Sequence, residues 1–231
     1  MELNILYQDF DVLVLDKPAG LVVFPENKTE EETLIDLVIE KYPEIESVGK
    51  PPRYGVVHRL DKDTSGVLLV AKNDKALGFL QKQFKENKVE KKYLALVIGH
   101  LKNKEGEIKT LIGRAPGDRR RQKVYLPTEP KSETKREAIT RYKVVEELKD
   151  YTLVEVSPKT GRKHQIRTHL AYLGHPIAGD RLYGFKNQPY PKGLNRQFLH
   201  AFYLKITLPS GPEKEFKSEL PSDLKNAIKD L

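Results

Sequence analysis

The sequence contains no cysteine and a single methionine. Without cysteine, the chain can form neither disulfides nor thiolate metal sites. It also has no run of about 18 apolar residues, and its first residues lack a basic start followed by an apolar stretch. These absences argue against a membrane span and against a secretory signal, and we expect a soluble cytoplasmic protein.

The charge of the chain is unbalanced, with 41 Lys and Arg side chains against 33 Asp and Glu, and the isoelectric point is about 9.3. A basic balance favours a polyanionic partner, usually RNA or DNA, although a basic surface can also serve solubility alone. At 231 residues, the chain suits one large domain or two small ones with a substantial core.

Hydrophobic periodicity predicts strands and helices that are interspersed without strict alternation. Strands are expected over residues 5–7, 12–15, 67–70, 93–98, 138–145, 152–156 and 200–208. Helices are expected from a capping box at Thr29, after a cap at Asn73, over 164–173 and near the C-terminus. The segment 113–130 is expected to be the least regular part of the chain. This order of elements is typical of a mixed-sheet α+β fold.

A polar loop, His58 to Gly66, runs directly into the apolar strand 67–70. Loops are where a rigid scaffold displays chemistry. The residues from Asp61 onward also look like the start of a calcium loop, but the twelfth position of such a loop needs a bidentate acid and here is Lys72.

Two carboxylates of this loop have a simpler alternative role, because an aspartate often only closes an Asx-turn. That role suits Asp63 well. It is less attractive for Asp61, since Arg59 and His58 crowd the same loop. Asp61 is therefore the better candidate for chemistry.

A second polar segment, Thr160 to Arg167, joins a predicted strand to a predicted helix. Its basic groups and the helix N-terminal amides would attract a phosphate or a carboxylate, and the alternative is a solvated basic turn. His164 and His169 do not form a metal pair, because five residues on a helix place them about 140° apart. No third ligand is apparent, so no metal site is predicted.

Tyr93 starts the predicted strand 93–98, where core packing with a satisfied hydroxyl is the simplest role for a lone tyrosine. Several lysines precede it, and they form either solvated helix surface or part of an RNA groove. They are Lys82, Lys85, Lys88, Lys91 and Lys92.

Five segments in order carry a family likeness that extends over nearly the whole chain. They are Lys17-Pro18-Ala19-Gly20-Leu21, His58 to Gly66, Lys92-Tyr93-Leu94-Ala95, Gly161 to Arg167, and Gly174-His175-Pro176-Ile177-x-Gly179-Asp180. Their order and spacing resemble those of the RluA-type RNA pseudouridine synthases, which isomerise uridine in folded RNA. One such motif is weak evidence, whereas five in order are strong.

The resemblance implies catalytic roles. Asp61 would be the catalytic carboxylate, Arg167 would pair with it and keep it ionised, and Tyr93 would stack on the uracil ring. Arg59 would fill the space that the flipped uridine leaves in the RNA. These roles agree with the physical demands of the reaction, because uridine must leave the stack before it can react and an aromatic face can hold the flipped base.

The predicted substrate-binding side chains are His58, Arg59, Arg162, His164, Arg114, Arg119, Arg120, Arg121 and Lys123. Many members of the family carry a small RNA-binding module before the catalytic domain, but this chain begins almost at the first catalytic-domain strand. We therefore expect a single catalytic domain over residues 1–231, with substrate selection by the basic loop from Arg114 to Lys123.

The expected fold is α+β, with a mixed, mainly antiparallel sheet flanked by helices and a central basic active-site cleft. Because the isomerisation needs no redox partner, phosphate donor or metal, we expect no cofactor. The expected partner is a structured RNA, either rRNA or tRNA, with no membrane and no obligatory protein partner, and the protein is expected to be a monomer.

Two other functions are compatible with parts of the pattern. A catalytically silent RNA-binding protein could use the same scaffold, but the presence of Asp61, Tyr93 and Arg167 removes its main support. A glycoside or nucleoside hydrolase could use Asp61 with Asp63 as a carboxylate pair and would release free uracil. For a synthase, attack on the sugar, attack on the base and abstraction of a sugar proton are all compatible with a carboxylate at position 61.

Overall fold

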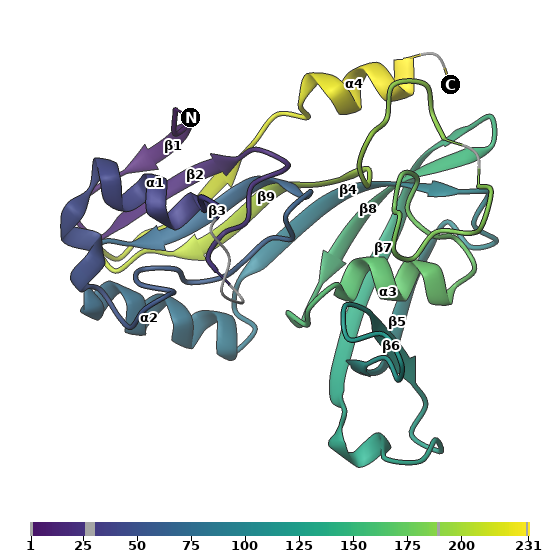
Figure 1. Ribbon diagram of the computed structural model, residues 1–231, viewed down its shortest axis with the longest axis horizontal. Coiled ribbons are helices and arrows are strands. Elements are labelled where there is room, and N and C mark those ends of the chain that lie inside the picture. Colours follow the sequence, from purple (N-terminus) through teal and green to yellow (C-terminus); the bar gives the residue numbers. More distant parts are fainter. Residues whose placement is uncertain (1, 26–30, 189, 230) are drawn as a thin grey trace. The chain divides into compact units, whose positions relative to one another are not determined.

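The computed structural model describes residues 2–25, 31–188, 190–229 and 231 (Figure 1). The contacts divide the chain into two compact units. The amino-terminal unit comprises Met1–Glu90 and Ala201–Glu219, and the carboxy-terminal unit comprises Lys91–His200 and Leu220–Leu231. Over the described ranges, no helix has both the length and the apolar character that a membrane crossing requires.

The amino-terminal unit is built on a sheet in which β2 pairs antiparallel with both β1 and β3, and β10 pairs antiparallel with β9. Its strands are β1 (Ile5–Gln8), β2 (Val12–Lys17), β3 (Ser65–Ala71), most of β9 (Leu199–Thr207) and β10 (Glu213–Lys217). Every residue of β3 is buried, and β2 is buried at all but one position. Strands with this pattern are covered on both faces, which explains their unbroken apolar sequences.

The unit has two helices. The first, α1 (Leu34–Lys41), follows β2 in the chain and is itself followed by the 3₁₀ turn η1 (Pro43–Ser47), and the second, α2 (Asp74–Lys85), follows β3. At the start of α1, the backbone N–H and the hydroxyl of Thr33 both donate to Asp36 Oδ2, at 2.9 and 2.7 Å. The expected cap Thr29 lies outside the described residues. At the start of α2, the predicted cap is confirmed, because Asn73 Oδ1 accepts the Ala76 N–H at 2.9 Å.

The carboxy-terminal unit contains a second group of strands, in which every neighbouring pair is antiparallel. In spatial order these are β4 (Glu90–Ile98), β8 (Tyr151–Pro158), β7 (Arg136–Leu148), β5 (Glu105–Arg114) and β6 (Gln122–Tyr125). The prediction of an α+β protein with a mainly antiparallel sheet is confirmed. The segment 113–130, expected to be the least regular, contains the short strand β6, which was not predicted and which pairs with the end of β5.

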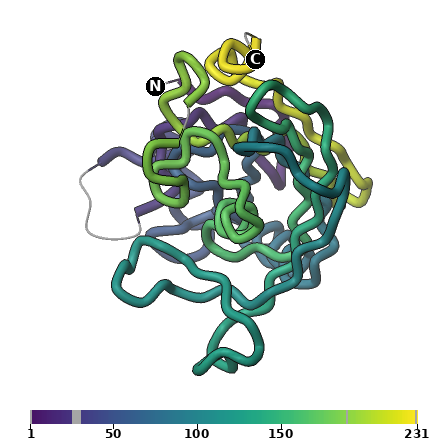
Figure 2. Tube along the Cα trace, turned by 90° about the vertical axis from the view of Figure 1, so that its right-hand side faces the viewer, coloured from purple at the N-terminus to yellow at the C-terminus, as the bar shows by residue number. Residues whose placement is uncertain are grey.

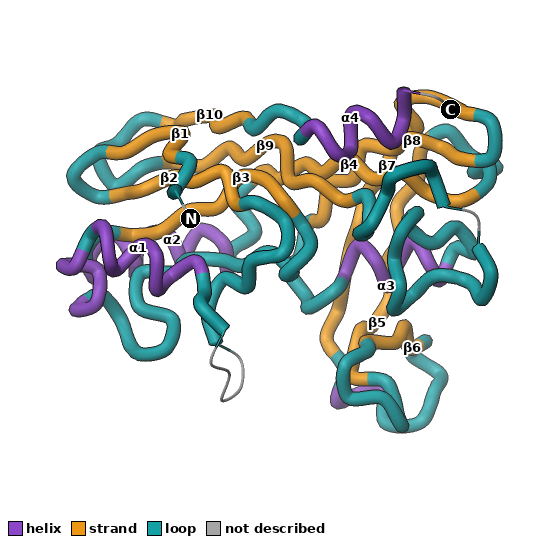
Figure 3. The backbone as a smooth tube through the Cα atoms, turned by 45° about the horizontal axis from the view of Figure 1, so that its top comes forward, coloured by secondary structure: helices purple, strands orange, loops and turns teal. Residues whose placement is uncertain are grey.

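The helix that carries the late basic motif, α3 (Gln165–Tyr172), packs against β6, β7 and β8 (Figure 1) and is seen almost end-on in Figure 2. Ile166 and Leu170 of α3 enter the core of the unit together with Leu224 and Ala227 of α4 (Ser222–Lys229). A short 3₁₀ turn, η2 (Ser132–Thr134), precedes β7. Between α3 and β9, the described part of the chain runs without helix or strand (Figure 3).

Candidate active site

The loop that carries Asp61 is fastened to the first motif by a buried lysine. Lys17 is fully buried, and its Nζ donates to the carbonyl oxygens of Pro18, Leu21 and Lys62, at 2.7, 2.8 and 3.0 Å. The Gly20 N–H donates to the Lys62 carbonyl as well, at 2.9 Å. A buried ammonium is stable only where it is well hydrogen-bonded, and these three acceptors are backbone groups of the two loops. Two motifs that lie more than forty residues apart in sequence therefore meet next to Asp61.

Asp61 itself is half-buried and begins a tight turn, in which the Thr64 N–H donates to the Asp61 carbonyl oxygen at 3.1 Å. Gly66, the second residue of β3, has φ +118°, a backbone conformation that other residues rarely adopt. A Cβ at this position would lie 2.2 Å from the carbonyl oxygen of Ala201. The glycine lets the strand after the loop approach β9, and so it fixes where the loop leaves the sheet.

The two residues near the start of the loop have well-defined contacts. His58 Nε2 accepts the Leu69 N–H at 3.1 Å, and its ring stacks on Phe84 of α2 with centroids 4.7 Å apart. The Arg59 guanidinium lies over the Phe24 ring at 5.1 Å from its centroid. His58 therefore ties the loop to β3 and α2, and Phe24 is a support for Arg59 that the sequence analysis did not identify.

A second arginine shares that ring. The Arg53 guanidinium lies 4.9 Å from the centroid of Phe24, and the Arg53 residue is exposed. Stacking on an aromatic face holds a guanidinium without consuming its hydrogen-bond donors. Arg53 therefore adds a positive charge beside Arg59 that the sequence analysis also missed.

In the carboxy-terminal unit, Tyr93 lies on β4 opposite Val156 of β8 and packs partly against the core. Lys91, two residues earlier on the same strand, has an unusual environment. Burial and the nearby Lys159 lower the pKa of Lys91 to about 8. A substantial fraction of neutral Lys91 is therefore present at mildly basic pH.

The strongest ion pair of the late basic motif joins Arg167 on α3 to Asp180. Arg167 Nε donates to Asp180 Oδ2 at 2.7 Å, and Nη2 donates to Oδ1 at 2.9 Å. The two side chains are only 8% and 0% exposed. Asp180 belongs to the fifth motif, to which the sequence analysis gave no role.

Tyr183 closes the other side of this group. The Arg167 guanidinium lies over its ring at 5.0 Å, and Arg121 approaches the same ring at 5.5 Å. The hydroxyl of Tyr183 accepts the Gln122 N–H at 2.7 Å and lies 2.9 Å from His164 Nδ1. His164 caps α3 with φ +54°, so the tyrosine joins the start of β6 to the start of α3.

The first turn of α3 is held by Gln165, which is buried. Its Oε1 accepts from the Thr160 hydroxyl at 2.8 Å and from the Arg162 N–H at 2.9 Å. Its Nε2 donates to the Ile139 carbonyl and to the Thr140 hydroxyl. The basic turn before α3 is therefore a fixed structure, and Arg162 Nε is held on the Glu137 carbonyl at 2.8 Å.

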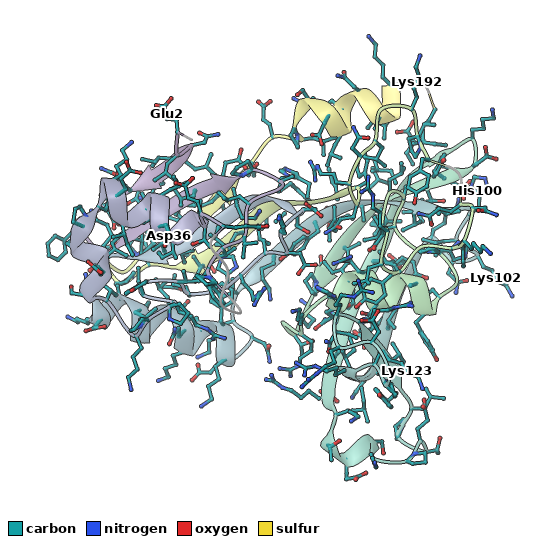
Figure 4. The ribbon with its side chains drawn as sticks, viewed as in Figure 1. Glu2, Asp36, His100, Lys102, Lys123 and Lys192 are labelled. Atoms are coloured by element: carbon teal, nitrogen blue, oxygen red, sulfur yellow. The ribbon has the colours of Figure 1, made fainter. Side chains whose placement is uncertain are left out.

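The basic loop of the sequence analysis forms the tip of the β5–β6 hairpin, where Arg114 ends β5 and Lys123 lies on β6 (Figure 4). Arg114, Arg119, Arg120, Arg121 and Lys123 are all exposed. Two of them have carboxylate partners: Arg120 pairs with Asp118 of the same loop at 3.0 Å, and Lys123 pairs with Glu129, which follows β6, at 2.8 Å. The hydrogen bond from Arg120 lowers the pKa of the Asp118 carboxyl. Exposed pairs of this kind are weak, so phosphates can compete for both cations.

The structure thus distributes the predicted site residues over two units. His58, Arg59 and Asp61 lie in the amino-terminal unit. In the carboxy-terminal unit, Tyr183 brings the predicted residues Arg121, His164 and Arg167 together. The pairing of Arg167 with Asp61 stays a prediction.

The comparisons with known proteins agree on one family. The model of the RNA pseudouridylate synthase family matches residues 11–172. The chain is 42% identical over 229 residues to ribosomal large subunit pseudouridine synthase D of Nitrosomonas europaea, covering 96% of this chain and 63% of that protein. It is 41% identical over 232 residues to an uncharacterized RNA pseudouridine synthase of Aquifex aeolicus, covering 97% of this chain and 71% of that protein.

A solved structure gives the same result at the level of the fold. Human RNA Pseudouridylate Synthase Domain Containing 1 matches with a TM-score of 0.74 at 31% identity, over 95% of this chain and 84% of that one. The chain belongs to the RNA pseudouridylate synthase family. It spans 63% and 71% of the length of the two curated relatives named above.

Proposed function

We propose that the protein is an RNA pseudouridine synthase that uses Asp61 as its catalytic carboxylate. The observation that carries the proposal is the family match over residues 11–172, which includes Asp61, Tyr93 and Arg167 within the segments that resemble the family motifs. The local structure around Asp61 supports it, because the buried Lys17 fixes the loop at the next residue, Lys62.

The reaction breaks the bond between C1′ of the ribose and N1 of the uracil, and it forms a bond from C1′ to C5. The proton on C5 is lost and N1 gains one, so the product is an isomer and no co-reactant is consumed. Asp61 acts in the bond exchange at C1′ or C5, and Tyr93 holds the flipped base on its ring. Arg167 would supply the positive charge that pairs with the catalytic carboxylate Asp61.

The proposed substrate is a structured RNA, and ribosomal RNA is favoured because the relative from Nitrosomonas europaea is named for the large ribosomal subunit. The exposed cations at the tip of the β5–β6 hairpin would contact the phosphate backbone, which dominates RNA affinity. Arg59, supported by Phe24, would occupy the gap that the flipped uridine leaves. In this proposal, the protein acts as a monomer.

The test uses ribosomal RNA transcribed with uridine that carries tritium at C5. A synthase releases this tritium to water while the RNA stays intact, because C5 loses its hydrogen when it bonds to C1′. Wild-type protein should release tritium, and Asp61→Asn should release none while still binding the RNA. Turnover by pure Asp61→Asn protein would contradict the assignment of the carboxylate.

The same assay separates the two alternatives. A hydrolase would place the tritium in free uracil, and its activity would also be lost in Asp63→Asn. A silent RNA-binding protein would bind the transcript and release no tritium. Transfer RNA labelled in the same way, tested beside ribosomal RNA, identifies the substrate class.

A further inference from the structure

Asp180 has a complete set of hydrogen-bond donors in the interior of the carboxy-terminal unit. Its Oδ1 accepts from Arg167 Nη2, from the Leu182 N–H and from the Tyr183 N–H, at 2.9, 2.9 and 3.0 Å. Its Oδ2 accepts from Arg167 Nε at 2.7 Å. The backbone donors fix the carboxylate, and the carboxylate fixes the plane of the guanidinium through two parallel bonds.

Tyr183 restrains the same guanidinium in the remaining direction. Its ring is buried and lies against the Arg167 guanidinium at 5.0 Å, while its hydroxyl is anchored on the Gln122 N–H at 2.7 Å. The fork from Asp180 therefore opposes rotation of the guanidinium, and the Tyr183 ring opposes its displacement toward the side on which the ring lies. An arginine side chain loses much rotamer freedom when it is held in this way.

A buried ion pair of this kind is poor evidence for a contribution to stability, because desolvation of both charges offsets most of their attraction. The main effect of this buried pair is to fix the orientation of the Arg167 guanidinium. From these contacts we propose that Asp180 and Tyr183 are positioning residues for Arg167, holding its guanidinium in the orientation that the isomerisation requires. The inference rests on the proposed function and goes beyond it, because neither residue has a role in that proposal.

The first test is Asp180→Asn, which keeps the shape of the side chain. The asparagine oxygen can accept the three donors that now meet at Oδ1, and its NH₂ group then faces the Arg167 Nε–H. Two donors oppose each other there, so the fork opens. Misplacing a catalytic partner by about 1 Å costs about 100-fold in rate. We expect kcat for tritium release to fall about 100-fold, with KM for RNA changed by less than about 3-fold, since the buried Asp180 side chain has no surface with which to contact RNA.

The second test separates the ring of Tyr183 from its hydroxyl. Tyr183→Phe keeps the stacked ring, so kcat should stay close to that of the wild type. Because it removes the acceptor of the Gln122 N–H beside the basic hairpin, KM should rise. Tyr183→Leu removes the stack and should lower kcat at least 10-fold below Tyr183→Phe. This pair of variants carries the test by itself if Asp180→Asn does not fold.

The unit contains a second arginine–aspartate fork, more exposed than the first, that serves as a control. Arg196 and Asp223 form another fork, with Nε to Oδ2 at 2.7 Å and Nη2 to Oδ1 at 3.2 Å. Asp223→Asn opens this fork by the same chemistry and should leave kcat unchanged. Thermal unfolding of every variant, with rates measured well below the lowest midpoint, separates loss of the fold from loss of positioning.

The results have distinct meanings. If folded Asp180→Asn retains the wild-type kcat, or if Tyr183→Leu and Tyr183→Phe have equal kcat, the positioning role is wrong and the group is only part of the core. If wild-type protein itself releases no tritium from any RNA, the proposed function fails instead.

Discussion

His169 makes stability sensitive to pH in a direction that the structure determines. Its ring lies on α3, fully buried, with Nδ1 2.8 Å from the Thr140 hydroxyl and Nε2 2.9 Å from the Thr110 hydroxyl. A neutral imidazole offers one donor and one acceptor, and a hydroxyl can meet either. Burial lowers the pKa of His169 to about 4, and no charged neighbour contributes to the shift.

The expected free-energy change follows from this pKa. The folded value of about 4 lies below the ordinary value of 6.5, so the unfolded chain binds a proton that the folded protein excludes. The free energy of unfolding therefore has its full value above pH 6.5, as far as this residue is concerned, and it decreases as the pH falls from 6.5 towards 4. One unit corresponds to 1.36 kcal/mol, so the shift is worth about 3 kcal/mol, and below pH 4 no further loss arises from this residue.

The measurement compares the free energy of unfolding in urea at pH 7 and pH 4 for the wild type and for His169→Gln. Glutamine can donate to one hydroxyl and accept from the other, but it does not titrate. The wild type should lose about 3 kcal/mol more than the variant over this range, because the titration of all carboxylates is common to both. The chain has no tryptophan, so far-ultraviolet circular dichroism is the probe.

His100→Gln is the control, because His100 is exposed and its ring Nε2 lies 3.0 Å from the Lys149 carbonyl oxygen. This variant should follow the wild type. The NMR titration of the His169 ring in the folded protein should have its midpoint near 4. A midpoint near 6.5, or equal pH dependence of wild type and His169→Gln, would refute the account of a neutral buried ring.

Three further outcomes are expected. Replacing Arg119–Arg121 with alanine should weaken RNA binding. The slope of the logarithm of the binding constant against the logarithm of the salt concentration should become shallower by about 0.7 to 0.9 per lost phosphate contact, and an unchanged slope would show that these side chains do not contact phosphates. Lys17→Met removes the ammonium donor from the carbonyls of Pro18, Leu21 and Lys62, of which that of Leu21 is buried, and should cost about 1–3 kcal/mol in urea unfolding, with lower tritium release because the Asp61 loop is no longer anchored. Arg167→Lys keeps the charge but cannot form the fork, so kcat should recover only partly relative to Arg167→Met; full recovery would show that charge alone suffices.

The helices could be predicted from sequence because their signals are local. Asn73 caps α2 as expected, and the stripe of Ala76, Leu77 and Leu80 enters the core. The start of α1 was predicted less well, since a Thr-x-x-Glu pattern at Thr29 competes with the Thr33–Asp36 pair that forms the cap. Both patterns satisfy the same local rule, so the rule alone cannot choose between them.

The strands that escaped prediction are β5, β6 and β10. In β5, the buried residues Ile108, Thr110 and Ile112 alternate with less buried neighbours. This is the period of two that is typical of a strand, but only two of the three buried residues are apolar, so the signal is weak. β6 has only four residues and owes its existence to pairing with Leu111–Arg114. Strands of this kind are specified by their partners, and a single segment of sequence does not show those partners.

The same distinction between local and distant information holds in the candidate site. The motif residues Asp61 and Arg167 could be found because their patterns are continuous in sequence. The supports of the site are discontinuous: Lys17 reaches a loop 45 residues away, and Arg167 finds Asp180 across 13 residues. Asp180 can reach Arg167 because the preceding residue is Gly179. Its φ is +78°, and a Cβ at this position would lie 2.1 Å from the Arg196 carbonyl oxygen.

Asp180 illustrates why such supports are hard to infer from sequence. In sequence it is an aspartate after a glycine in a loop, a context in which exposure and a simple turn are the ordinary expectation. In the structure it is fully enclosed, and both oxygens are committed to Arg167 and to the next turn of its own chain. Because burying a carboxylate demands nearly all of its hydrogen bonds at once, such a group is specified by the convergence of several segments. The sequence motif identifies Arg167, but only the structure identifies Asp180 and Tyr183, the groups that determine the direction in which its guanidinium points.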